Sequence, residues 1–341
     1  MTAPPMKNIL ITGSAGFIGT HVLRELLQRD ELASARIVAL DDLSGGFADN
    51  VPADPRVDFI AGNITDHELV DGLFKKYQFD AVYHLAAYAA EGLSHFIRRF
   101  NYQNNVIGSV NLLNAAVRHD TAHFVFTSSI AVYGQAPVPM TEETVPQPVD
   151  PYGVAKYAVE LDLRAATDMF GIGHTIFRPH NVYGEFQNTA DRYRNVVGIF
   201  MNCILQDKPL PVFGDGQQER AFTYVGDIAW QIAAAPFVAA AKNQTINIGS
   251  DTPTTVNELA SVIAGAFAVP LQIEHLAARD EVEFAWADHS LCRAVFGSRR
   301  ETSLVAGIHK MAEWVREVGP RASRPFRNIE ITKNLPESWR N

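Results

Sequence analysis

Cysteine is scarce in this chain: Cys203 and Cys292 are the only two among its 341 residues. They form no Cys-x-x-Cys pair and have no histidine cluster beside them, so the spacings typical of disulfide scaffolds and zinc sites are missing. We therefore expect two reduced, half-buried thiols of a cytosolic protein, and no metal site.

Positive charge and long apolar runs are also scarce. The 29 lysines and arginines are outnumbered by 38 aspartates and glutamates, a formal net charge of -9, and an acidic surface repels the phosphates of nucleic acids. No apolar stretch approaches the roughly 20 residues that span a membrane, and residues 1–8 lack the apolar core of a signal peptide. These absences predict a cytoplasmic protein that binds neither nucleic acid nor membranes.

The first half of the chain alternates short apolar runs with segments of helical periodicity. Short continuous apolar runs are typical of strands buried on both faces, and a repeating strand–helix pattern indicates a parallel sheet with helices on both sides. We therefore predict an α/β fold with a Rossmann-type, doubly wound parallel sheet. The expected strands are residues 9–12, 36–40, 57–60, 81–85, 123–128 and 174–178, and the expected helices are residues 17–29, 64–76, 101–118 and 152–170.

The rhythm changes after Asn181, where a polar, irregular segment and several prolines and glycines follow. A chain of this length favours one large domain and a smaller lobe. We predict a Rossmann domain of residues 1–180 plus about 225–250, and a smaller α/β substrate-binding lobe of residues 181–224 plus about 251–341. Later elements are expected as strands at 245–248 and 272–275 and as helices at 257–267 and 304–318.

Three glycines, Gly13, Gly16 and Gly19, lie between the first expected strand and the first expected helix. Glycine permits a tight turn, close approach to a pyrophosphate and close packing of helix on sheet, and the helix N-terminus attracts phosphate. Asp41 ends the second strand, about 20 positions on, where a carboxylate can accept from both ribose hydroxyls and would repel a 2′-phosphate. The pattern favours NAD over NADP; the alternative is that Asp41 or Asp42 only caps a turn.

A Tyr-x-x-x-Lys element, Tyr152 and Lys156, opens the last helix of the first half. Residues at i and i+4 share one helical face. A nearby ammonium and a positive nicotinamide favour the phenolate, so the tyrosine can act as a general base. The hydroxyl of Ser129, after the fifth strand, can share the substrate's proton. Each element alone is compatible with chance, but together, behind a dinucleotide-binding turn, they predict catalysis.

These motifs resemble the extended short-chain dehydrogenase/reductase superfamily and, within it, the NAD-dependent nucleotide-sugar epimerase/dehydratase family. The similarity runs from about Lys7 to about Gly319 and is greatest to the UDP-glucose 4-epimerase branch. It implies a homodimer that pairs the helices at 101–118 and 152–170 across a two-fold axis; the alternative is that these apolar faces are buried within one chain.

The resemblance also assigns roles by position. Ser129, Tyr152 and Lys156 would be catalytic. NAD would be bound by Gly13, Gly16, Phe17, Ile18, Gly19, Asp41, Asp42, Asn63, Ile64, Leu85, Ala86, Ala87, Asn104, Ser128, Tyr152, Lys156 and Pro179. The nucleotide sugar, a UDP-sugar above all, would be bound by Ser129, Asn181, Asn195, Val196, Phe213, Arg220, Arg279 and Ala285. A guanidinium suits a diphosphate because it bonds two oxygens at once; the alternative for both arginines is an ordinary surface ion pair.

The chain departs from the family pattern at three places. Ile130 and Ala131 occupy positions that are acidic in dehydratases and cannot transfer a proton, which disfavours dehydration. Ala89 stands where many 4-epimerases carry a lysine that reaches the cofactor. Ala285 aligns with a position where a small residue leaves room for an N-acetyl group on the sugar.

The expected function is therefore NAD-dependent epimerisation of a nucleotide sugar at C4, on UDP-glucose and UDP-galactose and on their N-acetylated forms, through a 4-keto intermediate. Three other conversions on the same scaffold stay open: a uronate 4-epimerase, a 5-epimerase and a 4-ketoreductase. A non-catalytic NAD-sensing protein is the alternative from a different class, although such proteins usually lose the tyrosine or the lysine.

Overall fold

A seven-stranded parallel sheet forms the centre of the computed structural model, which describes residues 6–191, 193–278, 284–320, 326–336 and 339. The strand order is β11-β6-β5-β4-β1-β2-β3, so the chain winds outward from β1 in both directions and confirms the predicted doubly wound α/β fold. The strands are β1 (Asn8–Thr12), β2 (Arg36–Asp41), β3 (Val57–Ala61), β4 (Ala81–His84), β5 (His123–Thr127), β6 (Gly173–Pro179) and β11 (Gln244–Ile248).

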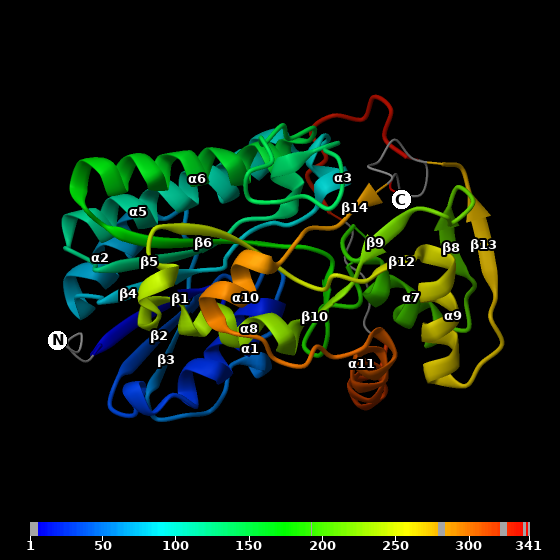
Figure 1. Cartoon of the computed structure of the whole chain (residues 1–341), viewed down its shortest axis with the longest axis horizontal. Coiled ribbons are helices and arrows are strands. Elements are labelled where there is room, and N and C mark those ends of the chain that lie inside the picture. The colour runs from blue at the N-terminus through cyan, green and yellow to red at the C-terminus, as the bar shows by residue number, and fades with distance from the viewer. Residues whose placement is uncertain (1–5, 192, 279–283, 321–325, 337–338, 340–341) are drawn as a thin grey trace.

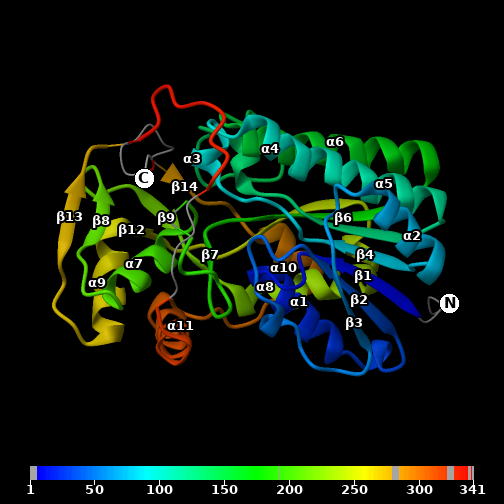
Figure 2. The same cartoon turned by 180° about the vertical axis from the view of Figure 1, so that it is seen from behind.

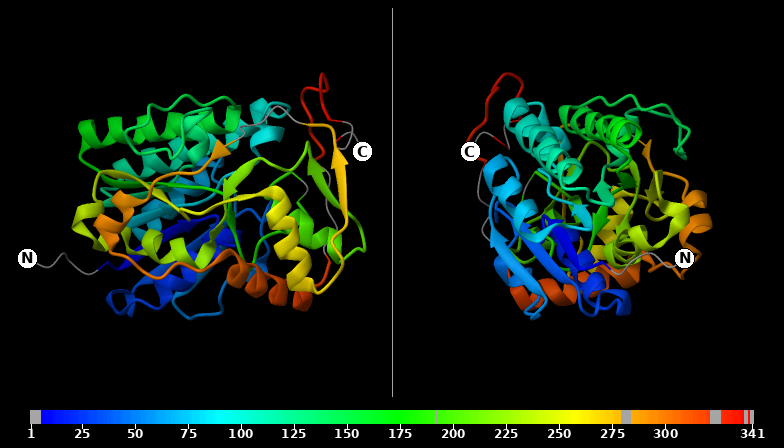
Figure 3. Two further views of the ribbon diagram at one scale, coloured as in Figure 1. Left: turned by 45° about the vertical axis from the view of Figure 1, so that its right-hand side comes forward. Right: turned by 90° about the vertical axis from the view of Figure 1, so that its left-hand side faces the viewer.

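Helices cover both faces of this sheet (Figure 1), and the layers are seen from other sides in Figure 3. Alternate strand residues point to opposite faces: Ile9 and Ile11 of β1 belong to one apolar core and Leu10 to the other. The first core is closed by α1 (Phe17–Leu27), α8 (Val225–Ala234) and α10 (Ser290–Phe296), and the second by α2 (His67–Tyr77), α5 (Gly108–Arg118) and α6 (Pro151–Phe170). We call this sheet with its six helices the sheet body.

A smaller assembly, which we call the end lobe, lies beyond the carboxyl ends of the strands (Figure 1). It has its own apolar core, which includes Phe200, Leu259 and Met311. Its helices are α7 (Val196–Ile204), α9 (Val256–Phe267) and α11 (Leu304–Val318). Its strands pair as β7 (Val182–Tyr183) with β10 (Thr223–Tyr224), β8 (Leu210–Phe213) with β13 (Ile273–Leu276), and β9 (Glu219–Ala221) with both β12 (Pro253–Thr255) and β14 (Phe284–Ala285).

The segment expected as one helix at 101–118 is helical throughout, and it contains a π-helical turn. It consists of α4 (Arg98–Tyr102), a π-helical turn (Gln103–Ile107) and α5, and a short helix α3 (Glu91–Ser94) precedes it. Residues 326–336 return to this region, as seen from behind in Figure 2, and the Glu330 carboxylate accepts hydrogen bonds from the backbone N–H groups of Arg99 and Phe100. Residues 326–336 therefore pack beside α4.

No helix within the described residues is both long and apolar enough to cross a membrane.

Candidate functional site

A cavity of about 1510 Å³ opens at the carboxyl ends of the parallel strands, between the sheet body and the end lobe. In open α/β sheets this edge is where ligands bind. Every site residue expected from the sequence lines the cavity, apart from Arg279, which lies outside the described residues. One wall therefore holds the glycine turn, and the opposite wall holds Asn195, Phe213, Arg220 and Ala285.

The glycine turn has a shape that only glycine can form. Gly13 has a φ of +71°, and a Cβ on it would lie 2.7 Å from the backbone N of Ala86. A Cβ on Gly19 would overlap the carbonyl oxygen of Gly13. Gly16 begins α1 without a side-chain cap, so the first-turn N–H groups remain available to an anion at the cavity. These features fit a dinucleotide pyrophosphate.

Asp41 caps a turn and also faces the cavity. Its carboxylate accepts from the backbone N–H groups of Ala15 (3.0 Å) and Leu43 (2.7 Å) and therefore shapes the glycine turn. Burial raises the pKa of Asp41, whereas these backbone hydrogen bonds lower it. The neighbouring Asp42 accepts from Asn63 Nδ2 at 2.7 Å, which ties together two more of the expected cofactor residues. Turn capping and ligand binding are thus compatible here.

Helix α6 delivers Tyr152 and Lys156 to the cavity in its first two turns. It begins at Pro151 because Asp150 caps it, accepting from the Gly153 N–H at 2.9 Å. Lys156 Nζ donates to the Thr127 carbonyl at 2.7 Å and lies 5.8 Å from the centre of the Tyr152 ring. Burial lowers the pKa of Lys156 to about 7, although the charge of Glu160 acts in the opposite direction.

The protein's own residues favour the protonated form of the Tyr152 phenol. Burial raises its pKa, the charge of Glu91 raises it further, and a hydrogen bond with Ser129 lowers it. The charge of Arg194 also lowers the pKa of Tyr152. A cationic ligand beside the ring would favour the phenolate further, because opposite charges nearby stabilise the ionised form.

A buried ion pair supports the floor of the cavity. The Ser128 hydroxyl donates to Glu160 Oε1 (2.6 Å), and Arg178 donates to both oxygens of Glu160 through Nε (2.9 Å) and Nη2 (2.5 Å). Arg178 Nη1 also donates to the Tyr133 hydroxyl at 2.7 Å. The hydroxyl of Ser128 thus bonds inside the protein, whereas Ser129 caps the following turn by accepting from the Ala131 N–H at 3.1 Å.

On the end-lobe side, Asn195 is the N-cap of α7. Its side-chain oxygen accepts from the Val197 N–H (2.9 Å), and its Nδ2 donates to the Val182 carbonyl (2.5 Å). Arg220 on β9 lies in register with Ala285 on β14, so these two expected substrate residues are neighbours across a strand pair. Asn181 adopts a φ of +42° directly after β6, where the chain turns into the end lobe.

Sequence reasoning missed several residues that line the cavity, among them Glu91, His95 and Arg194. Glu91 and His95 come from α3 and its end, which is docked on α6 because the Ser94 hydroxyl accepts from the Tyr152 N–H at 3.2 Å. Arg194 lies 4.8 Å over the ring of Tyr88 and pairs with Asp191 at 2.9 Å. The sequence feature that could have identified Arg194 as a site residue is its position directly before Asn195.

The sequence of this chain is similar to those of a known protein family. The model of the NAD dependent epimerase/dehydratase family matches residues 9–249. A curated relative, the putative UDP-glucose 4-epimerase of Methanocaldococcus jannaschii, is 32% identical over 90% of this chain and 98% of its own.

Two solved structures are similarly close. The UDP-glucose 4-epimerase of Thermotoga maritima with UDP-glucose has a TM-score of 0.85 at 30% identity, over 91% of this chain and 99% of that one. The UDP-N-acetylglucosamine 4-epimerase of Methanobrevibacter ruminantium M1, in complex with UDP-N-acetylmuramic acid, has a TM-score of 0.84 at 27% identity, over 92% and 99% of the two chains.

Proposed function

Because this chain belongs to the NAD-dependent epimerase/dehydratase family of enzymes, we propose that it epimerises a nucleotide sugar at C4, with UDP-glucose and UDP-galactose as its substrates. One observation carries the proposal: Tyr152, Lys156 and Ser129 line the same cavity as the glycine turn and as Asn195 and Arg220. The expected proton-transfer residues, the expected cofactor-binding turn and the residues expected to bind the diphosphate thus surround one space.

The residues support a chemistry in which the cofactor is regenerated. Bound NAD⁺ supplies a hydride acceptor that later returns the hydride. Tyr152, assisted by Ser129, takes the proton of the 4′-hydroxyl and gives it back, and Lys156 favours the phenolate. Arg220 and Asn195 hold the nucleotide in both sugar orientations, so the binding energy of the nucleotide is uniform and the sugar is free to turn.

Two features bear on the reaction and on the sugar. Ile130 and Ala131 line the cavity and carry no group that could transfer a proton, which disfavours dehydration. Ala285 lines it as a small side chain beside Arg220, and the relative from Methanobrevibacter ruminantium acts on an N-acetylated sugar. We therefore extend the proposal to UDP-N-acetylglucosamine; an enzyme that converts UDP-glucose but rejects the acetylated sugar would refute this extension.

The central experiment is a panel of nucleotide sugars, with chromatography to detect epimers. Wild-type protein should interconvert UDP-glucose and UDP-galactose without consuming NADH, whereas a ketoreductase would consume it in proportion to product. Tyr152→Phe should keep its NAD but lose about 10²- to 10⁴-fold in turnover, the usual contribution of acid–base catalysis. Tyr157→Phe, five residues further along α6, serves as the matched control. Near-full turnover by Tyr152→Phe would refute the assigned role.

Glu91 favours a second candidate, epimerisation at C5. Its charge acts on Tyr152 and its side chain lines the cavity, and the hydrogen on a carbon next to a C4 ketone is acidic enough for a carboxylate to remove. Reaction in deuterium oxide separates the two candidates. Deuterium at C5 that disappears in Glu91→Gln supports C5 chemistry, while product free of deuterium supports hydride transfer at C4 alone.

We also propose a homodimer that pairs α5 and α6 of two chains. Val154, Leu161 and Met169 on α6 are 40%, 48% and 76% exposed, and their spacing of seven and eight residues places them on one helical face. Ile107, just before α5, is 51% exposed. A row of exposed apolar side chains on neighbouring helices is typical of a protein interface.

A further inference from the structure

In the described part of the chain up to α11, the chain passes between the sheet body and the end lobe five times (Figure 1). The first passage follows β6, the second joins β10 to α8, and the third joins β11 to β12. The fourth joins β14 to α10, and the fifth joins α10 to α11. The cavity lies between these two parts, so the geometry of the passages determines how its walls face each other.

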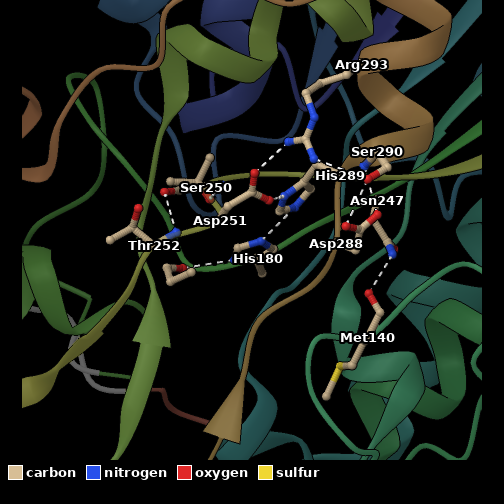
Figure 4. A network of polar contacts seen from close by, with 12 residues as sticks. Met140, His180, Asn247, Ser250, Asp251, Thr252, Asp288, His289, Ser290 and Arg293 are labelled. Atoms are coloured by element: carbon tan, nitrogen blue, oxygen red, sulfur yellow. Dashed lines mark hydrogen bonds and ion pairs between the residues drawn. The ribbon is translucent and has the colours of Figure 1, made fainter.

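One polar network connects the first four passages (Figure 4). His180, after β6, contacts His289, before α10, with 3.1 Å between their Nε2 atoms and 5.1 Å between ring centres. His289 Nδ1 lies 2.5 Å from Oδ1 of Asp251, which precedes β12. His180 Nδ1 lies 2.9 Å from the carbonyl oxygen of Ala221, at the end of β9. The Ser250 N–H donates to Thr223 Oγ1 at 3.1 Å, which ties the third passage to the second.

The hydrogen bonds determine how many protons the network holds. A carbonyl oxygen only accepts, so His180 Nδ1 carries a proton. One proton lies between the two Nε2 atoms and another between His289 and Asp251. The network thus holds three protons. Two neutral imidazole rings beside an ionised carboxylate would carry only two. Asp251 is also held by Arg293, whose Nη1 lies 2.5 Å from the other Asp251 oxygen.

His180 lines the cavity between two expected ligand residues, Pro179 and Asn181. Both of its ring nitrogens are engaged within the protein, so the ring is a positioning group and does not bond a ligand through them. Its partner carbonyl belongs to Ala221, the residue directly after Arg220. A Cβ on Gly249 would overlap the His180 ring, which shows how closely the passages pack here.

We propose that the His180–His289–Asp251 network fixes the end lobe against the sheet body and thereby positions Arg220 and Asn181 for the diphosphate of the nucleotide. The part of this proposal that concerns the diphosphate rests on the proposed function. The part that concerns the joining of the two lobes does not.

Addition or removal of a proton would disturb the network. A fourth proton would place two N–H groups against each other, and loss of one proton would remove a hydrogen bond. Burial and the neighbouring His289 lower the pKa of His180 to about 3, and the hydrogen bond from His289 lowers the pKa of Asp251. The acid limit therefore lies well below pH 6.5. The charged and titratable groups around the network, within the described residues, include Arg293 and Cys292 on α10, Asp288 before it, Glu301 after it, Asp227 on α8, and Glu142, which bonds the backbone N–H of Asn247.

The test compares His289→Gln and Asp251→Asn with wild type and with His119→Gln, a control at a distant edge of the sheet body. Hydrogen–deuterium exchange should speed up at the four passages in both network variants and stay unchanged in β1 and β4. Unchanged exchange at the passages would overturn the proposal. This measurement needs no substrate, so it stands even if the proposed function fails.

Titration with UDP tests the part of the proposal that concerns the diphosphate. Both network variants should bind UDP about tenfold more weakly, as expected for the loss of a charge-assisted hydrogen bond, while NAD binding stays within about twofold. Equal UDP affinity in variants with faster exchange would overturn the positioning of Arg220, and failure of wild type to bind UDP would overturn the proposed function instead.

Discussion

Glu160 shows how a single buried residue holds the cavity floor together. Its side chain is fully buried, and its two oxygens accept from Ser128, Arg178 and Arg164. A buried ion pair adds little net stability compared with an apolar pair, but removal of one partner leaves an unpaired charge in a medium of low polarity.

Glu160→Gln should therefore lower the free energy of unfolding by about 3–5 kcal/mol, because Arg178 would lose its counter-charge. Urea unfolding followed by circular dichroism measures this. Asp162→Asn, an exposed position two residues along α6, is the matched control and should change stability by less than about 0.5 kcal/mol. A loss under 1 kcal/mol for Glu160→Gln would mean that Arg178 finds other partners.

At the scale of elements, α6 serves two surfaces at once. Its N-cap Asp150 and its C-cap Gly171, with a φ of +77°, fix the two ends of the helix. The inward face carries Tyr152, Lys156 and Glu160, whereas the outward face carries the exposed apolar side chains of the proposed dimer. The same helix would thus join catalysis to assembly.

Leu161→Glu should convert the proposed dimer to a monomer, because burying an unpaired carboxylate at an apolar interface costs several kcal/mol. Sedimentation velocity at several protein concentrations measures the change. Leu271→Glu in the end lobe is a fair control, since Leu271 is 43% exposed and Leu161 is 48% exposed. A wild-type protein that sediments as a monomer would refute the interface altogether.

At the scale of the whole molecule, buried histidines set the response to acid. Burial lowers the pKa of His84 and His180 to about 3 and that of His123 and His174 to about 4. These rings stay neutral in the fold but take up a proton in the unfolded chain below pH 6.5. Acid therefore favours the unfolded state.

The free energy of unfolding should fall as the pH drops from 6.5 toward 4. Each fully buried histidine contributes about 1.4 kcal/mol per pH unit in that range. Urea unfolding at pH 7 and pH 5 measures the slope, which should be smaller in His123→Phe and unchanged in His309→Gln, at an exposed position. A slope of zero would mean that water reaches the buried rings.

Much of the architecture could be predicted from the sequence because it depends on local patterns. Apolar runs such as residues 9–12 specify buried strands, which the sheet order confirms. The glycine turn with Asp41 predicts an NAD site, and the NAD-dependent family confirms the cofactor. The π-helical turn at Gln103–Ile107 was missed because it occupies a single turn inside a helix that is otherwise regular. Glu91 was missed because no motif surrounds it.

The sequence alone determined the doubly wound sheet, the cofactor and the family, since each rests on short local patterns that are recognised without knowing how distant segments pack. Only the tertiary structure decided which distant side chains meet. His180, Asp251 and His289 are spread over more than 100 positions of the chain, and their contact follows from the way the chain crosses repeatedly between two packed cores. Periodicity and motif spacing do not predict such a contact, because it depends on how whole elements pack.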